Sequence, residues 1–178
     1  ASVEPKVAAP EAIQDFSGCT VIPGLVDSHV HLTMSGSADE EFRKRLRAAS
    51  YESIRRVIGD HLQGHLNHGV VAVRDGGGAR GYALQCARGY PGPVRVRAAG
   101  CGWHRDGRYG RLIGRTPAEG LGLAEAIRQD GARVDHLKIV NSGLNSLTEY
   151  GKQTAPQFDL TEMRAAVKAA AERGLSVM

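Results

Sequence analysis

The sequence predicts an α/β protein in which the strands of a parallel sheet alternate with helices that pack against it. Three observations predict this fold class. Apolar stretches of strand length recur along the chain, amphipathic stretches of helix length follow them, and helix-capping residues stand at several of the boundaries. Because a helix separates each strand from the next, consecutive strands are expected to run parallel, with right-handed crossovers.

The expected elements follow in chain order. Residues 1–12 look like a loose lead-in, and residues 13–22 look like a strand and a Ser-Gly turn that lead into the first long strand. Five parallel strands are expected, at 21–32, 70–78, 93–102, 135–143 and 175–178. Four helices are expected: one over 37–69 with a capping box of Ser37 and Glu40, one over 79–90, one with a capping box of Thr116 and Glu119, and one from a capping box of Asp159 and Glu162 to Gly174.

The length of 178 residues fits one well-buried domain. Two architectures agree with the order of strands and helices: a doubly wound five-stranded sheet, or part of a TIM-like (β/α)8 barrel. A whole barrel takes about 250 residues, so the second interpretation requires the barrel to be incomplete. The choice between them depends on the residues at the strand ends.

The composition is that of an ordinary soluble globular protein, with 42% hydrophobic and 24% charged residues. The formal net charge is +4, and much of the basic excess lies at 43–47 and 55–56. These residues follow a helical pattern, which favours a solvated helix face over a nucleic-acid surface. No apolar stretch approaches the roughly 20 residues of a membrane span, and there is no signal-peptide pattern. We therefore expect neither a nucleic acid nor a membrane as a partner.

The cysteines indicate a reducing compartment. Cys19, Cys86 and Cys101 are far apart in the sequence and odd in number. This arrangement argues against a disulfide framework and against a CxxC metal site. The expected location is the cytoplasm.

The first long strand ends in the stretch "VDSHVHL", which suggests a metal site. Side chains alternate along a strand, so Asp27, His29 and His31 are expected to share one face near the carboxyl end, where functional residues gather in parallel sheets. Two imidazoles placed two residues apart can bind one zinc ion. The alternative is a pair of partly exposed, hydrogen-bonded histidines.

Lys138 stands in the middle of an apolar strand, on the same face as His136 and Val140. An unpaired ammonium is unfavourable there, because burial disfavours the charged form. Either the side chain reaches out to solvent or pairs with a carboxylate, or it takes part in a binding site.

The stretch "PGLVDSHVHL" resembles the first barrel strand of the amidohydrolase superfamily, whose motif is PG-apolar-apolar-D-x-H-x-H. "NHGVVAVRDGGG" and "GPVRVRAAGCGWH" resemble the second and third units, and "ARVDHLKIVNSG" resembles the fourth strand. "FDLTEMRAAVKAAAERGLSVM" is similar to the helix that leads into the fifth. The resemblance covers residues 13–178 and is strongest to the prolidase-like and imidazolonepropionase-like branch, which has a lysine at the place of Lys138.

The resemblance implies a metal-dependent hydrolase that cleaves a C–N bond of an amide, a peptide or a cyclic amide through a metal-activated hydroxide. The expected substrate is a small molecule or resembles a dipeptide. It implies two zinc ions, with a carboxylated lysine as the bridge between them. The implied ligands from this chain are His29, His31 and Lys138. Residues expected around the metals or the substrate are Asp27, Trp103, His104, Asn141 and Ser142. His104 is expected to overhang the barrel mouth and to contact the substrate together with Trp103, the alternative being a plain loop residue.

The resemblance also implies that this chain is the N-terminal portion of such an enzyme. Residues 1–20 then form the lead-in and the last piece of a small β-sandwich, and 21–178 form strands 1 to 5 of the barrel. The remaining histidine ligands and the general-base aspartate are expected beyond Met178. We expect negligible activity from residues 1–178 alone, and a chain that forms a homo-oligomer or needs its C-terminal half.

An alternative function belongs to another class. A self-contained five-stranded α/β module could bind a phosphorylated ligand with the glycine-rich turn at 76–78. A further alternative is a non-catalytic half-barrel that assembles with a second chain.

His61, His65 and His68 have helical spacing, but no glutamate stands among them as in metalloproteases, so packing is expected of the first two.

Overall fold

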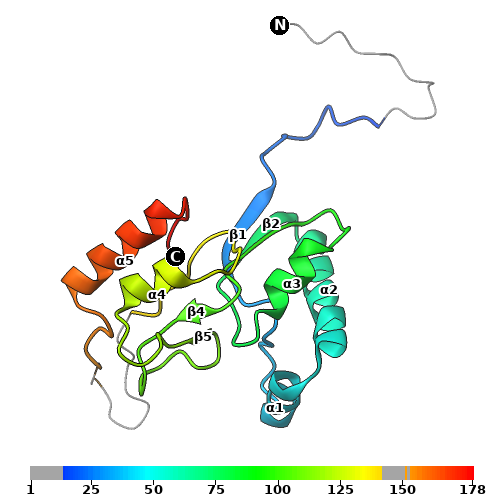
Figure 1. Cartoon of the computed structure of the whole chain (residues 1–178). Coiled ribbons are helices and arrows are strands. Elements are labelled where there is room, and N and C mark those ends of the chain that lie inside the picture. The colour runs from blue at the N-terminus through cyan, green and yellow to red at the C-terminus, as the bar shows by residue number, and fades with distance from the viewer. Residues whose placement is uncertain (1–13, 142–150, 152) are drawn as a thin grey trace, which may run out of the picture.

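The computed structural model describes residues 14–141, 151 and 153–178. Its central element is a parallel sheet of β1 (Leu25–Val30), β2 (Val70–Asp75) and β3 (Arg95–Ala98), in the order β1-β2-β3 (Figure 1). Two further stretches continue this order. Backbone hydrogen bonds join 135–140 to the chain that extends β3, and join 137–139 to 176–178. The bridges Trp103↔Ile139 and Leu137↔Val177 are both parallel.

This order distinguishes between the two expected architectures. A doubly wound sheet reverses its strand order at a switch point, whereas neighbours in a barrel follow the chain order. The five stretches lie side by side in chain order without a reversal, so the arrangement is that of consecutive barrel units. The fourth and fifth expected strands are present only as single bridges, because few of their residues form the paired hydrogen bonds of a ladder.

Two short strands follow β3. They are β4 (Gly102–Trp103) and β5 (Gly114–Arg115), which pair in parallel. The segment between them is a loop that folds back over the carboxyl end of the sheet, and Gly110 within it has a positive φ and lies against His104.

Five helices are present in the described residues, and two of the expected boundaries are wrong. The helices are α1 (Glu40–Ala48), α2 (Tyr51–Asn67), α3 (Tyr82–Arg88), α4 (Leu123–Gln129) and α5 (Leu160–Glu172). The helix expected over 37–69 is two helices, because Ala49 is extended and Ser50 caps a new one. Asp39, not Ser37, caps α1 and accepts from the Phe42 amide.

The capping box expected at Thr116 is also wrong. A turn closes from Leu121 N to Ala118 O, with Gly120 at a positive φ, and α4 begins only after Gly122. The capping box at α5 is confirmed, since the Asp159 side chain and the Glu162 side chain each accept from the other residue's backbone amide.

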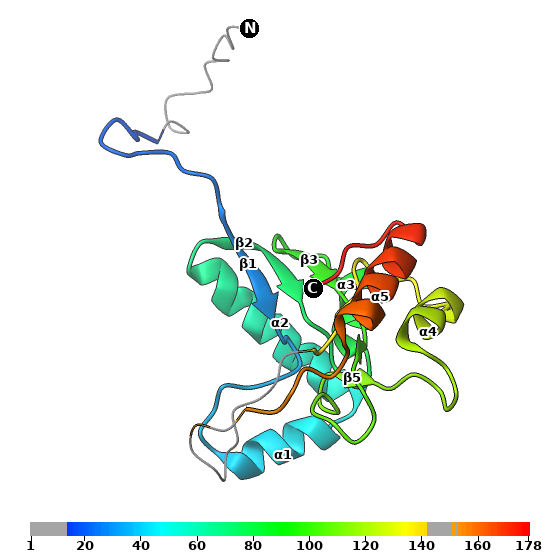
Figure 2. The same ribbon diagram turned by 90° about the vertical axis from the view of Figure 1, so that its left-hand side faces the viewer.

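The core consists of two clusters between the sheet and the helices. The first joins β1 and β2 to α2 and α3. It includes four side chains that are almost completely buried: Leu32, Ile58, Leu62 and Val73. The second joins the stretch 137–139 to α4 and α5 and includes Leu137, Ile127 and three alanines of α5. Figures 1 and 2 show α2 and α3 beside β1–β3, and α4 and α5 beside each other.

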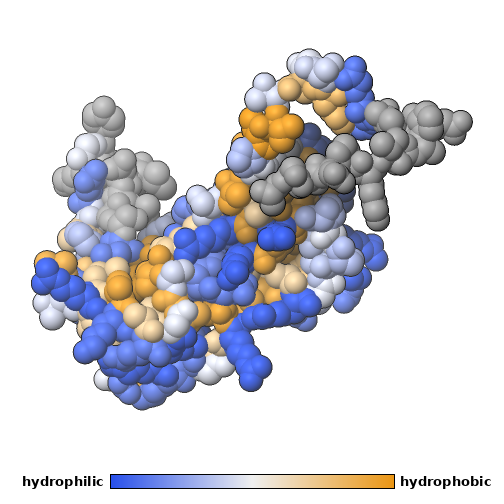
Figure 3. Space-filling view, turned by 90° about the horizontal axis from the view of Figure 1, so that it is seen from above, coloured by the Kyte–Doolittle hydropathy of each residue, from blue (hydrophilic) through white to orange (hydrophobic). Residues whose placement is uncertain are grey.

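Residues 14–24 contain a turn closed from Cys19 N to Phe16 O, but no strand. The strand expected within 13–22 is therefore wrong for residues 14–22, which have no strand to pair with in the described chain. Apolar side chains are exposed here and at the start of β1, including Val21 at 92% and Leu25 at 52%. The view in Figure 3 shows such apolar patches among charged ones. No helix in the described part of the chain is long and apolar enough to cross a membrane.

The carboxyl ends of β1 and β2 are joined by one buried carboxylate. Asp75 is fully buried, and its two oxygens accept from the Leu32 amide at 2.7 Å and the Gly77 amide at 2.8 Å. Burial raises the pKa of the Asp75 carboxyl, and the two hydrogen bonds oppose that effect. Asp75 therefore sets the position of the turn after β2 relative to the residues that follow β1.

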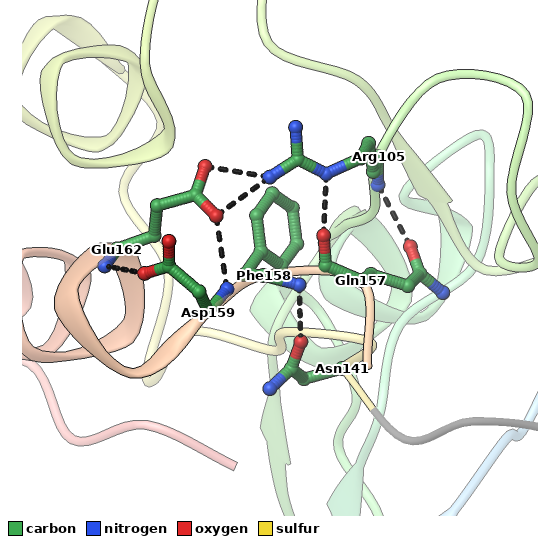
Figure 4. A network of polar contacts seen from close by, with 6 residues as sticks. All are labelled: Arg105, Asn141, Gln157, Phe158, Asp159 and Glu162. Atoms are coloured by element: carbon green, nitrogen blue, oxygen red, sulfur yellow. Dashed lines mark hydrogen bonds and ion pairs between the residues drawn. The ribbon is translucent and has the colours of Figure 1, made fainter. Parts of the chain in front are cut away.

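A second polar network joins the loop after β4 to the start of α5 (Figure 4). The Arg105 guanidinium donates to both carboxylate oxygens of Glu162, at 2.6 and 2.7 Å, and also to the Gln157 carbonyl. The Arg105 amide donates to Gln157 Oε1 at 2.8 Å. The guanidinium lies 4.9 Å from the centre of the Phe158 ring.

Replacement of Asp75 by Asn should lower the free energy of unfolding by about 1–3 kcal/mol, because the amide nitrogen of Asn would face a backbone donor that then loses its acceptor. Urea denaturation measures this. Asp60→Asn on α2 is the matched control, since Asp60 is exposed and should change the stability by less than about 0.5 kcal/mol. Equal stability of the two variants would contradict the role given to Asp75.

Replacement of Arg105 by Gln should lower the free energy of unfolding by about 1 kcal/mol, since the ion pair from one guanidinium nitrogen to Glu162 is partly exposed and screened by solvent. The matched control is Arg164→Gln on the exposed surface of α5, which removes the same charge. Denaturation of both variants should show a loss only for Arg105→Gln. A loss of the same size in the control would mean that net charge, not the network, is responsible.

Candidate metal centre

A β-bulge near the end of β1 decides which side chains lie on which side of the sheet. Asp27 pairs with Val73 and Val30 pairs with Asp75, so three residue steps of β1 are matched by two of β2. Val30 and Val73 pack against the helices in the first cluster. The residues on either side of Val30 therefore project from the opposite side of the sheet.

The two imidazoles share that opposite side, and Asp27 does not. The rings of His29 and His31 are 5.4 Å apart between centroids, in an edge-to-face arrangement. Asp27 Oδ2 lies 3.7 Å from Nε2 of His65 on α2, and Asp27 Oδ1 accepts from the His29 amide. The expectation that all three side chains share one face is wrong for Asp27, because the bulge shifts the alternation by one residue. Its contact with His29 is through the backbone.

The His31 ring is oriented by the turn after β2. Its Nδ1 is 2.8 Å from the Gly77 carbonyl oxygen, which requires Nδ1 to carry the proton and leaves Nε2 with a free lone pair. A Cβ atom at Gly76 would lie 2.9 Å from His31 Cε1 and 3.4 Å from His29 Cδ2. A side chain at this position would crowd the His31 ring, whereas its contact with His29 would be an ordinary one. That these glycines support the histidine pair was not predicted from the sequence. Their position directly after a strand and an aspartate could have indicated a role at the strand end.

Lys138 is adjacent to the imidazoles. Its Nζ lies 3.5 Å from His29 Nε2, which confirms that the stretch 135–140 and the end of β1 face the same space. Burial and then the Arg74 guanidinium lower the pKa of the Lys138 ammonium. Burial and then Lys138 lower the pKa of His29. Both shifts favour neutral nitrogen atoms, which are the forms that act as ligands.

These residues fit a divalent metal. A histidine that holds a metal usually donates its other ring N–H to a carbonyl or carboxylate, and His31 does so with Gly77. The set is incomplete by itself, since the described residues contain no group of three or more His, Cys, Asp or Glu side chains placed to hold a metal. Two imidazoles and one lysine amine form one side of a possible centre.

His136 lies two residues before Lys138 and is the most unusual buried polar group of this region. Its side chain is buried, and neither ring nitrogen has a hydrogen-bond partner by geometry. Burial lowers the pKa of His136 to about 4, with the Arg74 charge as the next cause. The ring is therefore neutral at physiological pH.

Trp103 and His104 are placed differently from the expectation. Both are buried, so His104 does not overhang the barrel mouth as expected. Trp103 packs in the second cluster, with the Arg115 guanidinium 4.3 Å from its ring centre. His104 Nδ1 lies 2.9 Å from the Arg105 carbonyl, and Gly110 covers its ring. The loop after β4 folds over them, which the local sequence does not reveal, and their contact with a substrate stays a prediction.

Asn141 is committed to the network of Figure 4. Its Oδ1 accepts from the Phe158 amide at 2.6 Å, and its carbonyl accepts from the Gln157 amide at 3.1 Å. This places Asn141 as the link between the end of the fourth strand and the start of α5. Ser142, predicted beside it, lies outside the described residues.

The glycine-rich turn has no amide group free for a phosphate. The amides of Gly76, Gly77 and Gly78 donate to the Val30 carbonyl, the Asp75 carboxylate and the Gly100 carbonyl respectively, and all three glycines are buried. The alternative of a phosphate-binding module at 76–78 is therefore not supported. The turn holds the imidazoles instead.

The helical histidines occupy structural positions. His61 Nδ1 lies 2.9 Å from the Leu32 carbonyl, and His65 pairs with Asp27 as described. His68 is exposed and caps its own helix by its contact with the Gly64 carbonyl. The packing expected for the first two is confirmed.

Curated relatives match this chain over short stretches. The imidazolonepropionase of Hyphomonas neptunium is 48% identical over 47 residues, which is 26% of this chain and 12% of that protein. The imidazolonepropionase of Methylobacterium nodulans is 47% identical over 55 residues, or 31% of this chain and 14% of that protein.

Solved structures match the fold along almost the whole chain. A prolidase complexed with N-methylphosphonate-L-proline superposes with a TM-score of 0.67 at 22% identity, covering 98% of this chain and 47% of that one. Ochratoxinase from A. niger gives 0.60 at 18% identity, covering 87% and 42%. The chain thus spans less than half the length of these structures. A model of the amidohydrolase family matches residues 20–178, and the chain belongs to that family.

Proposed function

We propose that this chain supplies one side of the metal centre of a hydrolase that cleaves a C–N bond in an amide, a peptide or a cyclic amide. The single observation that carries the proposal is the convergence of His29, His31 and Lys138 from two strands far apart in sequence. The family supports hydrolysis as the reaction. The names of the imidazolonepropionase and prolidase relatives support a cyclic amide or a dipeptide as the substrate class.

The residues of this chain would hold the metal through nitrogen and, after carboxylation, oxygen. His31 would bind through Nε2, since Nδ1 donates to Gly77. The lowered pKa of Lys138 increases the fraction of neutral amine, the form that can take up carbon dioxide. A carbamate at Lys138 would also replace a cation by an anion beside Arg74. We propose that the centre would hold two zinc ions, with His29, His31 and the Lys138 carbamate among their ligands.

A bound zinc ion supplies Lewis-acid activation of water and of the substrate carbonyl. The chain's own part is to hold the imidazoles in a fixed orientation, with no side chain at Gly76 to displace the His31 ring. We propose that the remaining ligands and the general-base aspartate come from other strands of a complete barrel. The function is tested by assaying hydrolysis of Xaa-Pro dipeptides and of a cyclic amide by the zinc-loaded complete enzyme. Full activity in its His29→Ala/His31→Ala variant would overturn the proposal.

The chain itself should bind zinc through its histidine pair. The double variant His29→Ala/His31→Ala should bind zinc at least about 100-fold more weakly than the wild-type chain, because both imidazole ligands are lost. Competition with a chromophoric chelator measures the affinity. His68→Ala is the control, since this exposed imidazole lies at the far end of α2 and its loss should leave the affinity unchanged. Unchanged affinity in the double variant would place the metal elsewhere.

Replacement of Gly76 by Ala should weaken zinc binding by about 10- to 100-fold while the chain stays folded, because the new methyl group displaces the His31 ring. The same competition assay measures this, with circular dichroism to confirm the fold. Gly59→Ala on α2 is the control, because a Cβ there meets nothing within 4 Å. If Gly76→Ala bound zinc like the control, the space at Gly76 would have no part in the centre.

A further inference from the structure

A pocket of about 250 Å³ lies beside the turns that follow β1 and β2, and neither His29 nor His31 lines it. Its walls come from four parts of the chain: the residues after β1, the junction of α1 and α2, the residues after β2, and the loop between β4 and β5. Figure 2 shows α1 below the carboxyl end of β1, where these parts meet. The hollow is therefore built by tertiary contact, not by one local turn.

The interior of the pocket is mainly apolar. Leu46 and Ile54 are 8% and 2% exposed and form its floor, and Met34 and Leu112 contribute further apolar surface. An apolar hollow of this kind favours a ligand with a hydrocarbon body, because binding removes apolar surface from water.

The rim of the pocket is cationic. Arg47, Arg80 and Arg111 line it, and none of the described residues that line it is an aspartate or a glutamate. Arg80 is held in place, since it donates to the Ala49 carbonyl at 2.8 Å and its guanidinium lies 5.8 Å from the Tyr82 ring centre. Arg47 and Arg111 have neither a hydrogen bond nor an ion pair to any described residue. Two unpaired guanidinium groups and a fixed third one thus surround an apolar hollow.

We propose that this pocket binds an organic carboxylate with an apolar body. Guanidinium groups bind carboxylates through paired hydrogen bonds, and the absence of acidic lining residues leaves their charge available. The apolar floor favours such a ligand over a small inorganic anion, and the cationic rim favours it over a neutral molecule of the same shape. The inference does not depend on the proposed metal centre, because none of the proposed metal ligands lines the pocket.

The test is titration of the wild-type chain with hexanoate, followed by calorimetry and by amide chemical shifts. Binding should shift the amides of the residues around the pocket. Hexanol and inorganic phosphate should each bind at least about fivefold more weakly, since each lacks one of the two contacts. Hexanol that binds as tightly would show an apolar site only, and phosphate that binds as tightly would show a general anion site. Either result would overturn the proposal.

Variants separate the pocket from the overall charge. Arg111→Gln and Arg47→Gln should each weaken hexanoate binding by about fivefold, the loss expected for an exposed charge-assisted contact. Arg45→Gln, exposed on the same helix as Arg47 but outside the pocket, should leave it unchanged. An equal loss in all three would indicate only general charge attraction. The variant His29→Ala/His31→Ala should still bind hexanoate, and a loss there would place the ligand at the imidazoles instead.

Discussion

The buried carboxylate of Asp75 is the constraint on which the arrangement of the metal-binding side chains depends. It accepts one hydrogen bond from the backbone that follows β1 and one from the turn that follows β2. With the two ends held in this way, the Gly77 carbonyl meets the His31 ring and Gly76 leaves space for that ring. A fully buried carboxylate is tolerated because each oxygen has a backbone donor, which compensates for the loss of water.

The structural role of the glycine-rich turn at 76–78 follows from this arrangement. A run of three glycines after a strand is compatible with a phosphate-binding loop, but such a loop needs free amide groups. Here the amides hold the ends of three strands together, and the missing side chain at Gly76 makes room for the His31 ring. The same glycines would suit a phosphate-binding loop or a turn that supports the imidazoles. Only the acceptors of their amide hydrogen bonds distinguish these two roles.

The region around the imidazoles carries an excess of positive charge, which a bound anion or anionic ligands of a metal would neutralise. In addition to burial, the Arg74 guanidinium lowers the pKa of the Lys138 ammonium, and both charges lower the pKa of the nearby His136. Burial and Lys138 also lower the pKa of His29. An arrangement of this kind is unfavourable for folding unless another group neutralises it. The pocket with Arg47, Arg80 and Arg111 is a second region with excess positive charge, but its apolar floor suits a different ligand.

The local sequence determined the elements that depend on near neighbours. The alternation of strand and helix, the capping box at Asp159, the histidine pair and the unusual lysine could all be predicted, because each is expressed within a few residues. The break between α1 and α2 at Ser50 and the late start of α4 could not be predicted, because alternative capping residues differ little in the free energy by which they stabilise a helix end. The tertiary structure alone decided the strand order, the bulge that turns Asp27 toward His65, the burial of Trp103 and His104, and the approach of Lys138 to His29. Each of these depends on pairing between segments far apart in the chain, where one residue of register reverses the side on which every following side chain lies.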